Sequence, residues 1–219
     1  AHIDHSGLLP RLCALGFRGA IYTTAATIDL LEVMLLDSAH IQEKEAEWRE
    51  QARKSGKSIR NHFAEPLYSV PQAHACLERL RAVDYDAEFS PKQGVRCRLR
   101  DAGHILGAAI IELWISESGR EKKMVFSGDI GRAGHPIVRD VTPIEDADIL
   151  LVESTYGDRL HRNLADTMAE LETALNETLS RRRGNVIVPA FAVGRTQDLL
   201  YLLTDLYRQK RLPPLYVYV

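Results

Sequence analysis

The chain has 219 residues, of which 45% are hydrophobic, enough to build one large domain or one domain and part of another. A formal net charge of −2 excludes the global positive field of a strongly basic nucleic-acid-binding domain, so any polyanion must be held by local basic patches or by bound metal. Three widely spaced cysteines favour reduced thiols in a cytoplasmic protein over a disulfide framework, and no apolar run is long enough to span a membrane.

Helices dominate the elements expected in the first part of the chain. Leucines at helical spacing predict a helix over residues 6–15, which Ser6 caps. A short strand follows over residues 19–23, and a long helix is expected over residues 26–48. Pro71 fits the first turn of a helix that runs to about residue 83, because a proline needs no amide partner there.

Strands are expected in the middle of the chain. Apolar and basic residues alternate over residues 95–100, and residues 108–115 and 123–127 are predicted strands on either side of a turn at Gly119. Residues 149–152 are a continuous apolar run, which predicts a fully buried strand.

Strand and helix alternate after Gly157. We expect a helix over residues 166–179, a buried strand over residues 186–189 and a helix over residues 196–207. This alternation predicts a parallel sheet with crossover helices, and we place a domain junction near Gly157.

The sequence has the features of an interrupted chain at both ends. The chain opens on a dense group of ligand-type side chains, without Met and without a strand to support them. It stops within residues 213–219, which have the composition of a strand that is just beginning. We therefore expect sequence to be missing on both sides.

The first chemical signal is the string H-x-D-H-x-G, which contains His2, Asp4 and His5. In an extended segment, residues two apart point to the same side, so His2 and Asp4 can face one cavity, and a turn at His5 adds a third ligand. Imidazole and carboxylate donors without thiolates suit an open, catalytic zinc site, and also iron or manganese. Alone, the string also fits an ordinary polar turn.

Two later strings add candidate ligands. His104 lies in the string DAGHILG, where small neighbours let the backbone approach a bound ion closely. Asp129 follows an apolar strand and is flanked by Gly128 and Gly131, and a carboxylate there can bridge two cations about 3.5 to 4 Å apart. Alone, His104 fits a structural or surface histidine and Asp129 fits a residue that only forms a turn.

The order of these strings carries the interpretation. H-x-D-H, then G-H-x-L-G, then S-G-D is the order found in the metallo-β-lactamase fold. The strings DILLVESTYG (148–157) and VPAFAVGRTQ (188–197) resemble motif A and the first strand-to-helix turn of a β-CASP domain. Over essentially its whole length, the chain resembles the β-CASP branch of the metallo-β-lactamase superfamily, in the group of the cleavage and polyadenylation specificity factor nuclease and its archaeal and bacterial relatives.

This resemblance implies an α/β chain. Residues 1–157 would form a partial metallo-β-lactamase αββα sandwich that lacks its N-terminal part, and residues 158–219 the incomplete beginning of a β-CASP domain with a parallel sheet. The implied activity is hydrolysis of RNA phosphodiester bonds, internal or exonucleolytic, by a hydroxide that two zinc ions activate, with manganese or iron as alternative ions. The expected substrate is single-stranded RNA, in the cytoplasm and without a membrane partner; a homodimer is left open.

By the same resemblance, His2 and His104 bind the first metal, Asp4 and His5 bind the second, and Asp129 bridges them. The family has a further histidine two residues before His2, and its motifs B and C each supply a histidine that would lie beyond Val219. The site in this chain would therefore lack at least two ligands, which puts the activity of the chain alone in doubt.

Three residues have further implied roles. Asp4 and Glu153 are the expected catalytic carboxylates, and Glu153 would orient the motif B histidine that protonates the leaving oxygen. A glutamate at this place in motif A is similar to the RNA-processing group. Arg195 follows Gly194 at a predicted helix start and is a candidate for binding an RNA phosphate, because a helix N-terminus favours anions.

Two other functions stay open at this point. A thioesterase or lactonase could use the same fold, since a fold does not fix the substrate. Such enzymes lack the β-CASP insert, so the segment after residue 158 speaks against them. An inactive RNA-binding homologue is the second alternative, against which the retained ligand-type residues speak.

Overall fold

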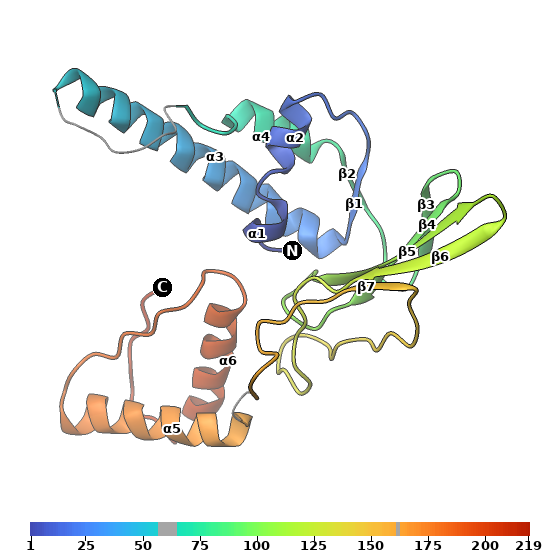
Figure 1. The fold of residues 1–219 in the computed structure, drawn as a ribbon. Coiled ribbons are helices and arrows are strands. Elements are labelled where there is room, and N and C mark those ends of the chain that lie inside the picture. The colour runs from blue at the N-terminus through green and yellow to red at the C-terminus, as the bar shows by residue number, and fades with distance from the viewer. Residues whose placement is uncertain (57–64, 161–162) are drawn as a thin grey trace. The chain divides into compact units, whose positions relative to one another are not determined.

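The computed structural model describes residues 1–56, 65–160 and 163–219 (Figure 1). Within these residues the chain is mixed α/β and forms two compact units, Ala1–Glu153 and Ser154–Val219. The division falls close to Gly157. None of the helices in the described residues is both long enough and apolar enough to cross a membrane.

A helical layer with a parallel strand pair forms the first part of the Ala1–Glu153 unit. Its helices are α1 (Ile3–Ser6), α2 (Leu9–Ala14), α3 (Ala25–Lys54) and α4 (Val70–Leu77), and its strands are β1 (Ile21–Thr23) and β2 (Leu80–Ala82). Thr24 caps α3 by accepting a hydrogen bond from the amide of Thr27. Leu31, Leu35 and Ala39 recur at helical spacing, and this buried face packs against residues of α4 and β2.

Two of the predicted helices are shorter than expected. The helix predicted over residues 6–15 forms as the shorter α2, in which Pro10 fits the first turn, and Ser6, the predicted cap, is instead the last residue of α1. The helix predicted over residues 71–83 ends at Leu77, and residues 80–82 pair with β1 as β2. Local periodicity misassigned β2 because its strand conformation depends on a partner far away in the sequence.

A mixed sheet forms the second part of this unit (Figure 1). Its strands, in spatial order, are β3 (Glu88–Lys92), β4 (Val95–Asp101), β5 (Ala109–Glu117), β6 (Arg120–Phe126) and β7 (Ile149–Leu151). The pairs from β3 to β6 are antiparallel, and β7 pairs with β6 in parallel. Ala102, Ala108, Ile110 and Val125 form a small core at the end of β4, β5 and β6 where the candidate site lies.

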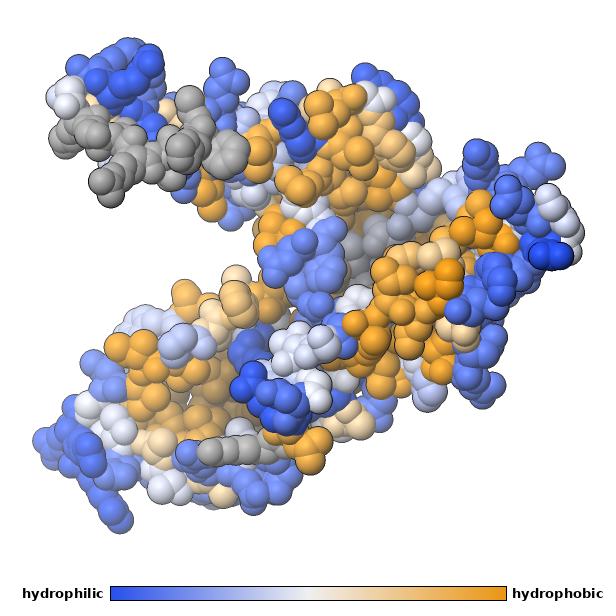
Figure 2. Space-filling model, viewed as in Figure 1, coloured by the Kyte–Doolittle hydropathy of each residue, from blue (hydrophilic) through white to orange (hydrophobic). Residues whose placement is uncertain are grey.

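The burial expected for β7 is wrong. Ile149, Leu150 and Leu151 form the predicted strand, but they are between 47% and 57% exposed. Figure 2 shows hydrophobic side chains gathered over β6 and β7. β7 pairs with β6 along one edge, and no described strand pairs with its other edge. Since the side chains of a strand point to the two faces of a sheet, their exposure means that these faces are incompletely covered at β7.

The Ser154–Val219 unit is helical in its described residues. It contains α5 (Leu164–Asn176), a π-helical turn η1 (Glu177–Arg181) and α6 (Arg195–Arg208), which enclose a core of Leu175, Leu206 and Leu212. Both helices match the sequence prediction closely. The strand predicted over residues 186–189 is not formed, and Ile187 is 89% exposed. No parallel sheet is present among the described residues of this unit, because a strand has no hydrogen-bonding partner there.

Candidate metal centre

The start of α1 brings two histidines together. His2 is the extended residue that precedes the helix, and His5 follows within its first turn. The amide of His5 donates to the carbonyl of His2, and the two imidazole rings lie 4.9 Å apart between centroids. Both rings are thereby presented on the same side of α1.

Asp129 receives both of these imidazoles on one carboxylate. It lies in the turn after β6, where Gly128 takes a positive φ of 55° that glycine adopts without strain. The Nε2 atom of His2 is 2.8 Å from Oδ2 of Asp129, and the Nε2 atom of His5 is 3.2 Å from Oδ1. Each oxygen of the carboxylate therefore has its own imidazole partner.

His104 approaches the same carboxylate from the loop between β4 and β5. Its Nε2 atom is 3.6 Å from Oδ2 of Asp129, and its ring is 5.5 Å from that of His2. Three stretches that are distant in the sequence, around residues 2–5, 104 and 129, thus converge, as the sequence interpretation requires.

A contact between two glycines holds the loops of His104 and Asp129 together. The amide of Gly131 donates to the carbonyl of Ala102, and the backbone of Gly131 lies directly against Gly103. A Cβ atom on Gly131 would lie 1.6 Å from the carbonyl oxygen of Gly103, a distance that no packing tolerates. The sequence places both glycines beside candidate ligands, but it does not show that they contact each other.

The electrostatics of the cluster favour an ionised carboxylate among imidazoles. Burial raises the pKa of Asp129, but hydrogen bonds and charge from His5 and His2 outweigh it and lower the pKa below its ordinary value. Burial lowers the pKa of His104 below that of a free imidazole, against the opposing charge of Asp129. His104 is therefore biased toward the neutral form that can donate a lone pair to a metal.

The local conformation predicted around Asp4 is wrong. The segment is helical from Ile3, not extended, so His2 and Asp4 do not share a face as residues of a strand would. The side chain of Asp4 is 79% exposed, and its carboxylate lies 3.9 Å from Nδ1 of His2, on the edge of the ring away from Asp129. His5, one residue later, reaches the cluster instead.

Glu153 lies beside the Asp129 turn. Its Oε1 atom accepts a hydrogen bond of 2.5 Å from the amide of Ile130, and its own amide donates to the hydroxyl of Ser127. Glu153, which follows β7, is thus hydrogen-bonded to residues on both sides of Asp129. The sequence of motif A does not indicate these contacts, because they join Glu153 to residues that are distant in the sequence.

Arg195 is the first residue of α6 in the Ser154–Val219 unit, and it is exposed. Gly194 precedes it with a φ of 85°, and the side chain of Gln197 accepts a hydrogen bond from the Gly194 amide. One amide at this helix start is therefore already satisfied within the protein.

The donor set fits a divalent ion. Donor atoms from His2, His5 and Asp129 lie within 4.8 Å of one another, and ligands of one zinc ion, with bonds of roughly 2.0 to 2.2 Å, are separated by about 3 to 4 Å. These residues and His104 line a cavity of about 570 Å³, together with apolar residues that include Leu31, Leu99 and Phe126. A polar cluster at the wall of a largely apolar cavity is a common setting for a catalytic site.

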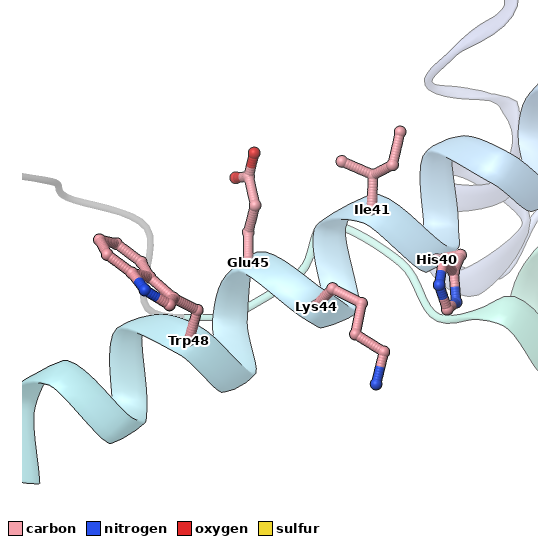
Figure 3. A pocket seen from close by; sticks show the side chains of 5 residues that line it. All are labelled: His40, Ile41, Lys44, Glu45 and Trp48. Atoms are coloured by element: carbon pink, nitrogen blue, oxygen red, sulfur yellow. The ribbon is translucent and has the colours of Figure 1, made fainter.

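A second hollow, of about 300 Å³, lies along the outer half of α3 (Figure 3). Its lining side chains come from one helix and are those of His40, Ile41, Lys44, Glu45 and Trp48. Lys44 pairs with Glu47, and Glu45 pairs with Arg49, so both charged groups are satisfied within the helix. This hollow is the surface of a charged helix and does not compete with the histidine cluster as a site.

The sequence was also compared with known proteins. It is 33% identical to ribonuclease TTHA0252 of Thermus thermophilus over 214 residues, which cover 97% of this chain and 43% of the relative. It is 30% identical to the transcription termination factor FttA of Methanothermobacter thermautotrophicus over 100% of the chain and 32% of the relative. It is 29% identical to cleavage and polyadenylation specificity factor 73 of Drosophila melanogaster, over 95% of the chain and 27% of the relative.

The matches cover nearly all of the chain, whereas the chain spans less than half the length of each of these relatives. No family model matches the chain. The relatives nevertheless come from the group that the motifs of residues 2–5, 104 and 129 indicated. The resemblance is therefore confirmed, and the chain is related to the β-CASP RNA nucleases of the metallo-β-lactamase superfamily.

Proposed function

We propose that this chain carries the metal centre of a zinc-dependent ribonuclease that hydrolyses phosphodiester bonds of single-stranded RNA. The observation that carries the proposal is the convergence of three imidazoles, from His2, His5 and His104, on the carboxylate of Asp129. In this proposal residues 1–157 are a partial metallo-β-lactamase domain with an αββα sandwich, and residues 158–219 are the beginning of a β-CASP domain.

Each residue of the cluster has a proposed place. His2 and His104 would hold one ion, His5 and Asp4 would hold the second, and Asp129 would be a ligand shared by both. When bound, such a pair of ions supplies an activated water nucleophile and neutralises charge on the phosphate. The chain's own contribution is to keep His104 neutral, to keep Asp129 ionised, and to hold both at the wall of the cavity.

The carboxylate of Asp4 is exposed and would have to move to reach a second ion. Asp4 lies in the first turn of α1, a helix of only four residues that ends at Ser6. So short a helix has little stability of its own, since most helical stability comes from length and packing. Binding of a second ion beside His5 can therefore draw the Asp4 carboxylate toward it at small cost.

Glu153 supports the centre through the backbone. By accepting a hydrogen bond from the Ile130 amide, its carboxylate holds the turn that presents Asp129. Its proposed second role, orienting a histidine that protonates the leaving oxygen, involves a residue outside this chain. Arg195 is the proposed contact for an RNA phosphate in the second unit, where its exposed side chain follows a helix start.

The proposal is tested by metal content and by RNA cleavage together. We expect the purified full-length protein to bind zinc at one or more equivalents, measured by elemental analysis after dialysis, and to cleave a labelled single-stranded RNA when zinc is present. In Asp129→Asn we expect zinc binding to fall by about a hundredfold or more, because the carboxylate is lost from the centre of the ligand set. Cleavage should fall with it.

Asp140→Asn is the matched control. Asp140 is a carboxylate in the loop that follows, where it accepts a hydrogen bond from the Gly134 amide, a role that an asparagine can retain. Its substitution should leave zinc content and cleavage unchanged. Efficient hydrolysis of a thioester or lactone with RNA left intact would show that the metal centre serves a small-molecule hydrolase instead.

A further inference from the structure

Hydroxyl groups gather on the carbonyls that end the His104 loop. The Oγ atoms of Thr24 and Thr27 each lie 2.9 Å from the carbonyl oxygen of Gly107 and donate to it. The hydroxyl of Tyr85 donates to the next carbonyl, that of Ala108, over 2.8 Å. All three donors come from outside the loop, and two of them come from the start of α3.

Each of these hydroxyl groups has one proton, and the placement of that proton determines to which acceptor the group donates. The Thr24 hydroxyl accepts the amide of Thr27 and divides its one proton between Oγ1 of Thr27, 3.0 Å away, and the Gly107 carbonyl, so Thr27 is the hydroxyl that has Gly107 as its acceptor. Burial raises the pKa of Tyr85 to about 12, so its phenol keeps its proton and donates. Thr24 and Thr27 are 4% and 6% exposed, and water cannot replace a donor there without opening the structure.

Gly107 is shaped for this contact. Its φ is 85°, and a Cβ atom on it would lie 2.6 Å from Oγ1 of Thr27. Only a glycine therefore lets the loop backbone approach the start of α3 so closely. The loop turns at this point, where the amide of Ala108 donates to the carbonyl of Ile105.

His104 lies between two anchors of its loop. On one side, the carbonyl of Ala102 is bonded by the Gly131 amide, which belongs to the Asp129 turn. On the other side, the carbonyl of Gly107 is bonded by Thr24 and Thr27. The first anchor sets the distance from His104 to Asp129, and the second fixes the loop against α3.

We propose that Thr27, together with Thr24, is a positioning residue for His104: its hydroxyl fixes the Gly107 end of the loop and so holds the His104 imidazole in the geometry that binds metal. This inference rests on the proposed metal centre. Thr27 lines the same cavity as His2 and Asp129, yet its hydroxyl is engaged by Gly107 and acts through the loop.

The test compares Thr27→Val, which replaces the hydroxyl by a methyl group of similar size, with Thr27→Ser, which keeps the hydroxyl. Thr24 is not substituted, because it also caps α3. The matched control is Tyr68→Phe. Tyr68 is also buried and its hydroxyl bonds to Ser38 of α3, but this bond does not involve the His104 loop.

Two measurements report on positioning. Zinc affinity is measured by competition with a chromophoric chelator, and the geometry of the ligands by the visible absorption spectrum of the cobalt(II)-loaded chain. Amide hydrogen exchange in the metal-free chain, followed by NMR at Ala108, reports on the loop itself. Thermal unfolding of the metal-free variants measures whether a change in zinc affinity or amide exchange is accompanied by a general loss of stability.

In Thr27→Val we expect zinc affinity to fall by about tenfold or more, as when an outer partner of a metal-ligating histidine is removed. The cobalt spectrum should shift, and the Ala108 amide should exchange at least about tenfold faster while amides of β5 keep their protection. Thr27→Ser should restore all three readouts, and Tyr68→Phe should change only the thermal stability.

The contrary outcomes are distinct. Normal zinc affinity, an unchanged cobalt spectrum and unchanged exchange at Ala108 in Thr27→Val would overturn the positioning role. An equal loss of zinc affinity in Tyr68→Phe would also overturn it, because general destabilisation would then explain the effect. Failure of the full-length wild-type protein to bind zinc would overturn the proposed metal centre itself.

Discussion

Two carboxylates of the first unit, Glu112 and Asp129, are surrounded by nitrogen donors, yet their settings differ. Glu112 on β5 is 2% exposed and is paired with Arg98 and Lys123, whose cations are permanent near neutral pH. Asp129 is 32% exposed at the wall of a cavity, and its partners are imidazoles. A carboxylate neutralised by fixed cations is structural, whereas one held by imidazoles, whose nitrogens are themselves metal ligands, can offer its charge to a metal ion.

The surroundings of the two groups extend this contrast. Lys123 also pairs with Asp146, and Arg98 lies near Glu88, so cations and carboxylates alternate across the sheet face. The ring of Trp114 lies beneath this network, with the guanidinium of Arg96 4.3 Å from its centroid. The basic residues of β4 are therefore occupied within the protein, and this face is not a free surface for RNA phosphates.

The largest expected effect is on the Asp129 side of the comparison, from Gly131→Ala. The added methyl group would overlap the carbonyl of Gly103 and force the His104 and Asp129 loops apart. We expect zinc binding to be lost and the apparent melting temperature to fall, measured by competition titration and by thermal unfolding. Gly184→Ala is the control: its Cβ would meet the nearest atom, a methyl group of Thr178, at an ordinary 3.4 Å.

The second effect is on the Glu112 side, from Glu112→Gln. Loss of the buried charge leaves two cations short of one partner, but Lys123 keeps Asp146 and Arg98 keeps Glu88. We expect the free energy of unfolding to fall by roughly 3 kcal/mol in urea titrations, at the low end for breaking a buried pair. Zinc affinity should be unchanged.

Glu121→Gln is the surface counterpart of that variant. Glu121 is 47% exposed and pairs with Arg96, so its loss should cost less than about 1 kcal/mol. A cost equal to that of Glu112→Gln would contradict the contrast between buried and exposed pairs.

A smaller effect is expected from Trp114→Leu. The ring contacts the cations of Arg96, Arg98 and Lys123 at 4.3, 5.1 and 5.3 Å from its centroid. Leucine keeps an apolar surface but has no ring to attract a cation. The free energy of unfolding should therefore fall by about 1 to 2 kcal/mol. An unchanged urea midpoint would mean that the ring only covers the charge network.

The smallest effect is a dependence on pH. Burial opposes ionisation of Glu112, but hydrogen bonds from Arg98 and Lys123 lower its pKa below the ordinary glutamate value. Its contribution to stability is therefore complete above the unfolded-state pKa and is lost as pH falls through the lower, folded pKa. Arg100 also faces this carboxylate, from β4.

The stability difference between wild type and Glu112→Gln should shrink on acidification below the ordinary glutamate pKa, by at most about 1.4 kcal/mol per pH unit. Urea titrations of both proteins between neutral and acidic pH measure it. A difference that stays constant throughout would mean that Glu112 does not titrate as proposed.

Much of the fold follows from local sequence patterns. The strands β4, β5 and β6 and the helices α3, α5 and α6 appear near their predicted ranges, because alternation and helical spacing are set by neighbouring residues. The histidine and aspartate strings also indicated the residues that cluster, His2, His5, His104 and Asp129, although Asp4, predicted with them, lies outside the cluster. Their side chains identify metal-ligand chemistry wherever the backbone brings them together.

Other features were decided by contacts between distant residues. β2 is a strand because β1 pairs with it, and β7 is exposed because the faces of the sheet are incompletely covered there. The sequence did not indicate that Asp4 would lie on a helix turn, since α1 has only four residues, too few for a helical periodicity to be recognised. Nor could it reveal that Glu112 sits in a buried charge network.

The sequence by itself determined the candidate donors, His2, Asp4, His5, His104 and Asp129, and the order in which they occur. Only the tertiary structure decided how they are held: the fit of Gly131 against Gly103, and the hydroxyls of Thr24 and Thr27 on Gly107. The reason is physical. Ligand chemistry belongs to a single side chain, whereas a backbone carbonyl is the same at every residue and acquires its partner only when the chain folds.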